Sequence, residues 1–522
     1  MTPSRRLTRL TTLAYTVGVC FSLAAETPME IAISQDSTSG ARPVEPDLFS
    51  LSIEQDRWLD WQLTGVPPRI RVGGKSQDVT YIDPNTQWAS VSFAKPTPSM
   101  PYPEALVMRV GTRFYSSARF LPEKTRVVHG LNFASTDDMR GFFHLASIVN
   151  AFTSAEIRKA GIVLDAIEIG NEPDAYGTTS TLRNSSYDSS EYVTEWQTWA
   201  GNVLPIEQVY PEFKLKLWGG SLSRSSHDLT GWSPQALLDQ GLLNSTAGER
   251  ISTISQHRYD SKPCESVLRE LQELPSKSSV RNSLDAFKFD IYISRQHDLE
   301  HWFMILVRAP SDTIRTLSKG AVGISDTAAA ALWTLDYALY ASTLGVSRVF
   351  FHQGIGYRSN MVQPIALAHS PDDGSRLPVA LPPHVNAPYY AAIIGAEAIG
   401  SHGSTRIAEM PVDDSRIAGY AFYEGDTLAR VLLINSQPYF APTGEGIFQT
   451  RPAIRVTLST ESSEFRIKRL SIPFTDSTSG MRWGNVTYES DDGRPSGVEH
   501  FEHVKAKDGF DISATEVVLA FL

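Results

Sequence analysis

The sequence predicts an α/β protein, a (β/α)8 TIM barrel joined to a C-terminal β-sandwich domain that also takes an N-terminal strand. The chain has 522 residues, more than a single barrel of about 250 residues needs. Strand-like runs alternate with helical stretches up to about residue 395, and short β-runs separated by turns follow. We therefore expect an N-terminal strand region at 26–45, a barrel at 46–395 and a β-sandwich at 396–522.

The strand-like runs share alternating or continuous apolar residues and end at glycine, proline or polar residues. The barrel region contains seven clear runs, at 48–54, 68–74, 127–133, 166–170, 215–220, 251–257 and 346–352. The flanking regions contain further runs, at 27–36, 417–423, 428–434, 453–458 and 516–522. The polar span 475–495 is typical of a loop.

The firmest helix prediction covers residues 326–344. Four apolar residues of this segment fall on one helical face: Ala328, Leu332, Leu335 and Leu339. Ser325 can cap its start, Asp326 suits the N-terminal end of the helix dipole, and Gly345 is placed to end it.

The N-terminus predicts a cleaved secretory signal peptide over residues 1–25. Basic residues come first, an apolar run follows at 13–23, and two alanines precede Glu26. The apolar run is shorter than the roughly 20 residues that span a bilayer, so we expect no membrane association after signal removal. Three glycosylation sequons, at Asn184, Asn244 and Asn485, are consistent with a secreted, extracellular protein.

Charge and motif composition exclude several classes of partner. The net charge of −11 argues against nucleic acid binding. The sequence has no HExxH motif, its histidines are scattered, and Cys264 is the single cysteine beyond the signal. We therefore expect no metal and no cofactor.

The run 166–174 places Glu172 where a strand must end, because Pro173 cannot continue a sheet ladder. Catalytic groups of a (β/α) barrel lie at the carboxyl ends of its strands. A carboxylate beside the amide of Asn171 suits acid/base chemistry on a sugar, and the alternative is an acid of a surface loop. His257 and Tyr259 close another strand and line either a pocket or the core.

Five motifs in order resemble glycoside hydrolase family 79, which contains β-glucuronidases and heparanase-like endo-glucuronidases. The motifs lie at 71–78, 170–173, 257–259, 323–327 and 351–357. The resemblance implies a (β/α)8 barrel with a β-sandwich, a glycan substrate containing glucuronic acid or its 4-O-methyl form, and Glu172 as general acid/base. It further implies that several residues contact the sugar, namely Asn171, Glu54, Asp78, His257 and Tyr259, and that Gly356 and Tyr357 meet the substrate carboxylate.

A retaining mechanism needs a second carboxylate about 5–5.5 Å from the first. The resemblance aligns Asp312 with the glutamate nucleophile of the family, and Glu300 and Asp298 are the alternatives. The connection 54–68 is also short for a barrel crossover. These departures leave open a catalytically impaired carbohydrate-binding paralogue, or misplaced exon borders. The sequence does not decide between exo and endo cleavage or assign an oligomeric state.

Overall fold

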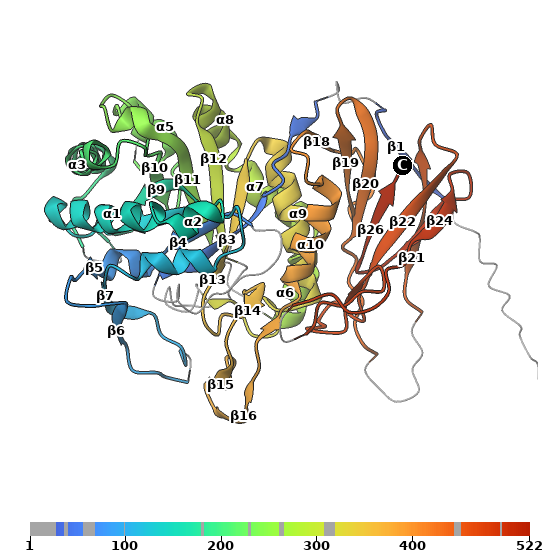
Figure 1. Ribbon diagram of the computed structural model, residues 1–522. Helices are drawn as coiled ribbons and strands as arrows, with labels where there is room; N and C mark the ends of the chain where they lie inside the picture. Colours follow the sequence, from blue (N-terminus) through green and yellow to red (C-terminus); the bar gives the residue numbers. More distant parts are fainter. Residues whose placement is uncertain are drawn as a thin grey trace, which may run out of the picture.

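A computed structural model of the chain shows two parts, a barrel and a β-rich domain, with helices between them (Figure 1). The structure describes residues 28–35, 40–55, 68–98, 100–178, 182–227, 231–259, 266–306, 319–442, 450–490 and 493–522.

The first part is a closed eight-stranded barrel in which every neighbouring pair is parallel. Its strands follow one another around the barrel in chain order, and β13 closes the ring by pairing with β3. They are β3 (Phe49–Glu54), β4 (Ile70–Gly73), β8 (Arg126–Leu131), β9 (Val163–Ile169), β10 (Leu217–Leu222), β11 (Ile251–Tyr259), β12 (Glu300–Leu306) and β13 (Arg348–Gln353). This confirms the predicted TIM barrel.

Strand β12 is the one barrel strand that the seven predicted runs lacked. Its sequence, Glu-His-Trp-Phe-Met-Ile-Leu, shows no alternation because the strand lies between β11 and β13 and is buried on both faces. Its register with β11 pairs Thr253 with Glu300 and Tyr259 with Leu306, so Glu300 starts the strand and Leu306 ends it.

The interior of the barrel is filled by large apolar side chains at mid-height. Trp218 and Trp302 meet edge to face at 4.5 Å between ring centroids, and Phe350 packs against both. Below them, at the amino ends of the strands, Arg69 and Arg348 each lie over the Trp302 ring and pair with Asp47. The barrel is therefore closed below, and its open end is the rim at the carboxyl ends of the strands.

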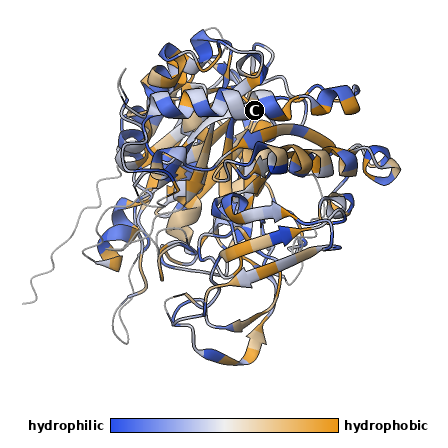
Figure 2. Ribbon diagram, turned by 90° about the vertical axis from the view of Figure 1, so that its left-hand side faces the viewer, coloured by the Kyte–Doolittle hydropathy of each residue, from blue (hydrophilic) through white to orange (hydrophobic). Residues whose placement is uncertain are grey.

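Helices cover the outside of the barrel. Figure 2 shows barrel strands mainly in the hydrophobic colour and surrounding helices with both colours. Two of the longest begin at an aspartate whose carboxylate accepts backbone N–H bonds, Asp137 for α1 and Asp188 for α3. The helices are α1 (Asp138–Phe152), α2 (Ala155–Lys159), α3 (Ser189–Val203), α4 (Ile206–Val209), α5 (Pro234–Asp239), α6 (Val267–Glu273), α7 (Lys277–Asp285), α8 (Lys288–Gln296), α9 (Ala328–Leu344) and α10 (Pro388–Ile399).

Helix α9 corresponds to the firmest helix prediction, with two differences. The helix begins at Ala328 and not at Asp326, and its N-cap is Thr327 and not Ser325. It ends as predicted at Gly345, whose φ is 107°. The helix is buried on all sides because it lies between the barrel and the C-terminal domain (Figure 1). Its first N–H groups, those of Ala328 and Ala329, donate to the backbone carbonyls of Ser477 and Thr475 of that domain.

The C-terminal domain consists of two packed sheets, which confirms the predicted β-sandwich. The larger sheet contains β2 (Arg42–Pro43), β18 (Thr405–Glu409), β19 (Ile417–Glu424), β20 (Thr427–Asn435), β26 (Glu516–Phe521), β22 (Glu464–Ser471), β23 (Arg482–Trp483) and β24 (Glu502–Lys505). The smaller contains β1 (Met29–Ala32), β21 (Ala453–Ser459) and β25 (Phe510–Ser513). Since β1 pairs with β21, the N-terminal strand belongs to this domain, as predicted.

Two insertions extend from the rim and project together in Figure 1. The first, between β4 and β8, forms a sheet of β5 (Thr80–Ile82), β6 (Ala89–Phe93) and β7 (Ala105–Val110). The second follows β13 and contains the pairs β14 (Val362–Gln363) with β17 (His384–Val385), and β15 (Leu367–His369) with β16 (Arg376–Leu381). They meet where the Tyr102 hydroxyl donates to the His369 carbonyl and accepts from the His369 N–H.

The described residues also form four short 3-10 helices, η2 (Lys75–Val79), η3 (Tyr115–Phe120), η4 (Pro173–Ala175) and η5 (Gly248–Arg250). In the parts of the chain that the structure describes, none of the helices combines the length and apolar character that crossing a membrane requires. Most of the short connection between β3 and β4, residues 56–67, lies outside the described residues.

Candidate active site

Glu172 lies at the rim, three residues after the end of β9. Its backbone is left-handed, with φ 53° and ψ 55°, and its N–H donates to the Ser221 carbonyl at 3.0 Å. A non-glycine residue rarely adopts this conformation unless its surroundings hold it there. Pro173 then starts η4, so the chain turns out of the sheet at the carboxylate, as the sequence predicts. The side chain of Glu172 is 20% exposed, which gives it partial access to solvent.

His257, near the end of β11, contacts this carboxylate directly. Its Nδ1 lies 2.8 Å from Oε1 of Glu172, and its side chain is only 6% exposed. Nε2 is buried and has no hydrogen-bond partner among the described residues. A carboxyl group and an imidazole at this distance are hydrogen-bonded, and an imidazole in contact with a rim carboxylate suits general acid/base chemistry.

Arg71 of β4 fixes the amide beside Glu172. Its Nη2 donates to Oδ1 of Asn171 at 2.9 Å and to Oε2 of Glu168 at 2.6 Å, while Nε donates to the same Glu168 oxygen at 2.8 Å. Both members of this ion pair are almost fully buried, Arg71 at 1% and Glu168 at 0% exposure. Because Arg71 donates to Oδ1, the side-chain group of Asn171 that is left to contact a ligand is Nδ2, which is a donor.

Serine hydroxyls complete the polar layer beneath the site. The Ser221 hydroxyl donates to Oε1 of Glu168 at 2.8 Å and lies 2.9 Å from the Ser255 hydroxyl. Ser52 accepts from Arg71 at 3.0 Å and lies 3.1 Å from Nδ1 of His352. This polar layer lies between the aromatic cluster of Trp218, Trp302 and Phe350 and the rim. Its hydroxyls hydrogen-bond to the buried charges of Arg71 and Glu168, which position Asn171.

Asp78 supports the turn at Asn171 and Glu172 through the hydroxyl of Tyr176. The Tyr176 hydroxyl donates to Oδ2 of Asp78 at 2.8 Å and accepts from the Asn171 N–H at 3.4 Å. Burial, reinforced by the negative charges of Glu168 and Glu172, raises the pKa of Asp78 to about 8. A carboxyl of this pKa holds its proton at neutral pH.

The raised pKa of Asp78 predicts a pH-dependent stability. The folded state binds this proton more tightly than the unfolded chain, so the contribution is full below about pH 4 and is lost as pH rises towards 8. The variant Asp78→Asn keeps the acceptor for Tyr176 and lacks the titration. Between pH 6 and pH 8 its free energy of unfolding is expected to gain about 2 kcal/mol relative to the unsubstituted chain, measured by urea unfolding. A constant difference across this range contradicts the prediction.

Gly356 and Tyr357 lie in the turn after β13, with their donors engaged. The Gly356 N–H donates to Oε1 of Gln363 at 2.9 Å, and the Tyr357 hydroxyl donates to Oε1 of Glu104 at 3.0 Å. Tyr357 packs against His352, with 5.9 Å between ring centroids, so the turn is connected to the polar layer through His352 and Ser52.

Other predicted site residues fall partly or wholly outside the described residues. Asp312 lies in the segment 307–318, and the side chains of Glu54 and Tyr259, at the ends of β3 and β11, are likewise outside the description. Glu300 and Asp298 are wrong as nucleophile candidates, because they lie at the amino end of β12. Glu300 pairs with Arg348 at that end. Met304, the residue of β12 that lies opposite His257, is four residues further along the strand, so Glu300 is about 13 Å from the level of His257.

Sequence reasoning did not identify Glu168 and Tyr176 as part of the site. A charged residue inside the otherwise apolar run 163–169 is a signal that could have revealed Glu168, because such a residue requires a buried partner. Tyr176 carries no comparable signal, since its role depends on contacts with Asp78, which lies 98 positions away in the sequence.

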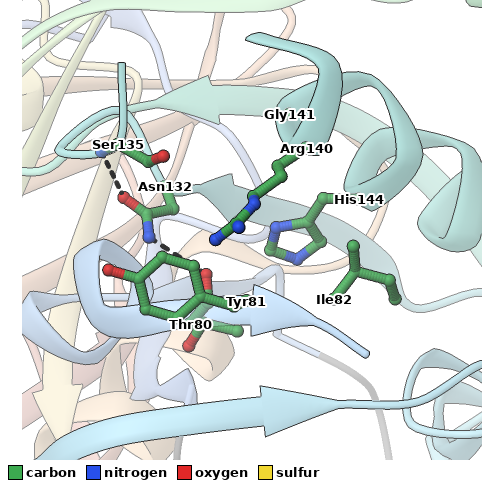
Figure 3. Close-up of a pocket in the computed structure, with 8 residues that line it drawn as sticks. All are labelled: Thr80, Tyr81, Ile82, Asn132, Ser135, Arg140, Gly141 and His144. Carbon is green, nitrogen blue, oxygen red and sulfur yellow. Dashed lines mark hydrogen bonds between the residues drawn. The ribbon is translucent and has the colours of Figure 1, made fainter. Parts of the chain in front are cut away.

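A separate small pocket lies between β5, α1 and the loop after β8 (Figure 3). Asn132 spans its wall by donating to the Thr80 carbonyl and accepting from the Ser135 N–H, and Arg140 and His144 line the opposite side. None of the predicted site residues lines this pocket.

Comparisons with known proteins agree with the fold. Residues 419–519 match the profile of the glycosyl hydrolase family 79 C-terminal beta domain. A β-glucuronidase of Aspergillus niger is 26% identical over 466 residues, covering 86% of this chain and 80% of the relative. A β-glucuronidase of Neurospora crassa is 25% identical over 520 residues, covering 89% of each.

Solved structures show the same architecture. A 4-O-α-L-rhamnosyl-β-D-glucuronidase of Fusarium oxysporum superposes with a TM-score of 0.75 at 21% identity, covering 95% of this chain and 100% of that one. An α-L-arabinofuranosidase of Thermotoga maritima gives a TM-score of 0.55 at 12% identity, covering 95% and 98%.

The barrel, its rim carboxylate and these matches define the class of the protein as a glycoside hydrolase. Within this class, the chain is similar to glycoside hydrolase family 79, the family that the five motifs resemble, and its residues 419–519 match the C-terminal domain of that family.

Proposed function

We propose that the chain is a secreted retaining hydrolase of β-glucuronidase type, which cleaves O-glycosidic bonds of glucuronic acid or its 4-O-methyl form in glycans. The names of the two fungal relatives support this substrate class. The observation that carries the proposal is the contact of 2.8 Å between Glu172 and His257 at the open end of the barrel.

Glu172 acts as the general acid/base in this proposal. It first donates its proton to the leaving glycosidic oxygen, and then, as a carboxylate, takes a proton from the water that attacks the glycosyl intermediate. His257 lies within hydrogen-bond distance of Oε1. It can therefore accept or donate the hydrogen bond as the charge on Glu172 changes.

Asn171, Asp78, Glu54, Tyr259, Gly356 and Tyr357 are proposed to bind the sugar. Arg71 holds Oδ1 of Asn171 and thereby orients the amide, so that Nδ2 can donate to the sugar 2-hydroxyl. Contacts at this hydroxyl strengthen in the oxocarbenium-like transition state. Because Asp78 holds its proton near neutral pH, it can donate a hydrogen bond to a sugar oxygen.

Asp312 is proposed as the nucleophile. It is the first carboxylate in the sequence after the end of β12, and β12 is the seventh strand of the barrel. Its carboxylate would attack the anomeric carbon as the leaving-group oxygen takes the proton of Glu172, and water would then release the sugar with retained configuration.

The direct test is hydrolysis of an aryl β-glucuronide, followed by proton NMR of the first product. Release of the β-anomer of glucuronic acid is expected, and release of the α-anomer would contradict a retaining mechanism. A mechanism-based glucuronide inactivator is expected to label Asp312, as read by peptide mass spectrometry. Labelling of any other carboxylate would overturn the assignment.

The variant Asp312→Glu tests whether side-chain reach limits the reaction. Aspartate is one methylene shorter than glutamate, and a misplacement of about 1 Å can cost about 10²-fold in rate. We expect Asp312→Glu to raise kcat on the aryl β-glucuronide by up to about 10²-fold. An unchanged or lower rate would show that the scaffold fits aspartate.

The proposal includes secretion and the domain limits at 46–395 and 396–522. The signal peptide 1–25 lies outside the described residues. The N-terminal sequence of the protein recovered from the culture medium of an expressing host is expected to begin near residue 26, and retention inside the cells would contradict secretion.

The second candidate is a carbohydrate-binding paralogue without catalysis. It is favoured by one observation, the aspartate at the position where the family places a glutamate nucleophile. Binding of glucuronic acid without turnover above that of a Glu172→Gln control would support this candidate over the hydrolase.

A further inference from the structure

We propose that Glu104 is a specificity-determining residue that competes with the carboxylate of the substrate for the anion site around Tyr357. The inference rests on the proposed function, and it concerns a residue that the motifs of the sequence did not include. Its basis is that a carboxylate of the chain itself occupies donors suited to a uronate.

Each carboxylate oxygen of Glu104 faces a donor. Oε1 accepts from the Tyr357 hydroxyl at 3.0 Å, and Oε2 lies 3.5 Å from the ammonium group of Lys75. A second ammonium group, that of the buried Lys319, lies 5.2 Å from the centroid of the Tyr357 ring. A phenol and an ammonium group around one position bind a carboxylate, whether it belongs to a side chain or to a sugar.

The Tyr357 hydroxyl is held in place by packing. A Cβ atom at Gly354 would lie 2.5 Å from the Tyr357 ring, so the ring lies directly on the backbone of the turn. Tyr357 itself is 4% exposed. The phenol therefore cannot turn away from Glu104 without repacking.

Glu104 is held equally firmly. The next residue begins β7, which pairs with both β5 and β6. Two residues earlier, Tyr102 is anchored by two hydrogen bonds to His369, and its backbone carbonyl accepts from the Lys319 ammonium group. The backbone that carries Glu104 is thus anchored on both sides.

Electrostatics give the direction of the effect. A uronate that accepts from the Tyr357 hydroxyl comes within about 5 Å of Glu104, where like charges oppose each other strongly in a partly buried site. Lys75 is 71% exposed, so solvent screens much of its compensating charge. Glu104 therefore weakens the binding of a glucuronide and has little effect on a neutral glucoside.

The first test compares kcat/KM for aryl β-D-glucuronide and aryl β-D-glucoside. The variant Glu104→Gln keeps the acceptor for Tyr357 and removes the charge. It is expected to raise the glucuronide to glucoside ratio about tenfold, with the glucoside value unchanged. Glu249→Gln, an exposed charge removal at the amino end of β11, is the matched control and is expected to leave the ratio unchanged.

The second test measures binding and does not depend on turnover. The dissociation constant of D-glucuronic acid, measured by calorimetry on the whole chain, is expected to fall about tenfold in Glu104→Gln, while that of D-glucose stays the same. If no variant hydrolyses the glycosides, the proposed function fails and this measurement still decides the role of Glu104. An equal or weaker affinity for glucuronic acid in Glu104→Gln would overturn the inference.

Discussion

Replacing Glu172 by glutamine is expected to lower kcat on an aryl β-glucuronide by about 10²–10⁴-fold, the range that general acid/base groups contribute. Glutamine has nearly the same shape and can still hydrogen-bond to His257, but it cannot supply or take a proton. The loss is expected to be larger for a poor leaving group, which depends on protonation, than for a nitrophenol. Initial rates with two aglycones of different acidity measure this difference.

The same variant offers a second, chemical readout. Azide needs no general base, so it can attack the glycosyl intermediate and is expected to restore turnover with formation of a β-glycosyl azide. Mass spectrometry of the product detects it. The control Glu249→Gln is expected to retain full activity without azide. Unchanged activity in Glu172→Gln would exclude Glu172 as the acid/base.

Replacing Arg71 by methionine is expected to destabilise the protein by about 3–5 kcal/mol, because it leaves the buried carboxylate of Glu168 without its partner. The same change releases Oδ1 of Asn171. Urea unfolding followed by tryptophan fluorescence measures the stability.

A double variant separates the lost partner from the lost packing. Replacing Arg71 by methionine and Glu168 by glutamine together removes both charges. The double variant is expected to be more stable than Arg71→Met alone, because no unpaired charge remains in the barrel. Equal stability of the two variants would show that packing around Arg71, and not its charge, supports the fold.

Local patterns predicted most of the architecture. Turn residues and apolar runs identified seven barrel strands, and Gly345 correctly ended α9. Strand β12 was missed because its apolar run of five residues, from Trp302 to Leu306, has no period. The single apolar face assigned to α9 was incomplete, since packing from the C-terminal domain buries the opposite face too.

The sequence predicted which residues lie near the candidate site, but it did not predict which of them contact one another. Glu172 and His257 could be placed at strand ends from the sequence, but their contact joins residues 85 positions apart. The carboxylate at Tyr357 comes from Glu104, 253 positions earlier in a rim insertion. Such pairings depend on the closure of the barrel and on how its loops fold back, which local sequence does not encode.

The backbone bonds from the start of α9 to Thr475 and Ser477 carry a consequence for any attempt to divide the chain. An isolated barrel would expose to water the buried side of α9 that faces the C-terminal domain, and it would lose two acceptors for the first turn of the helix. The β-sandwich thus supports the fold of the barrel that carries Glu172. Substitutions among the last fifty residues can therefore disturb the barrel around Glu172, although they lie in the other domain.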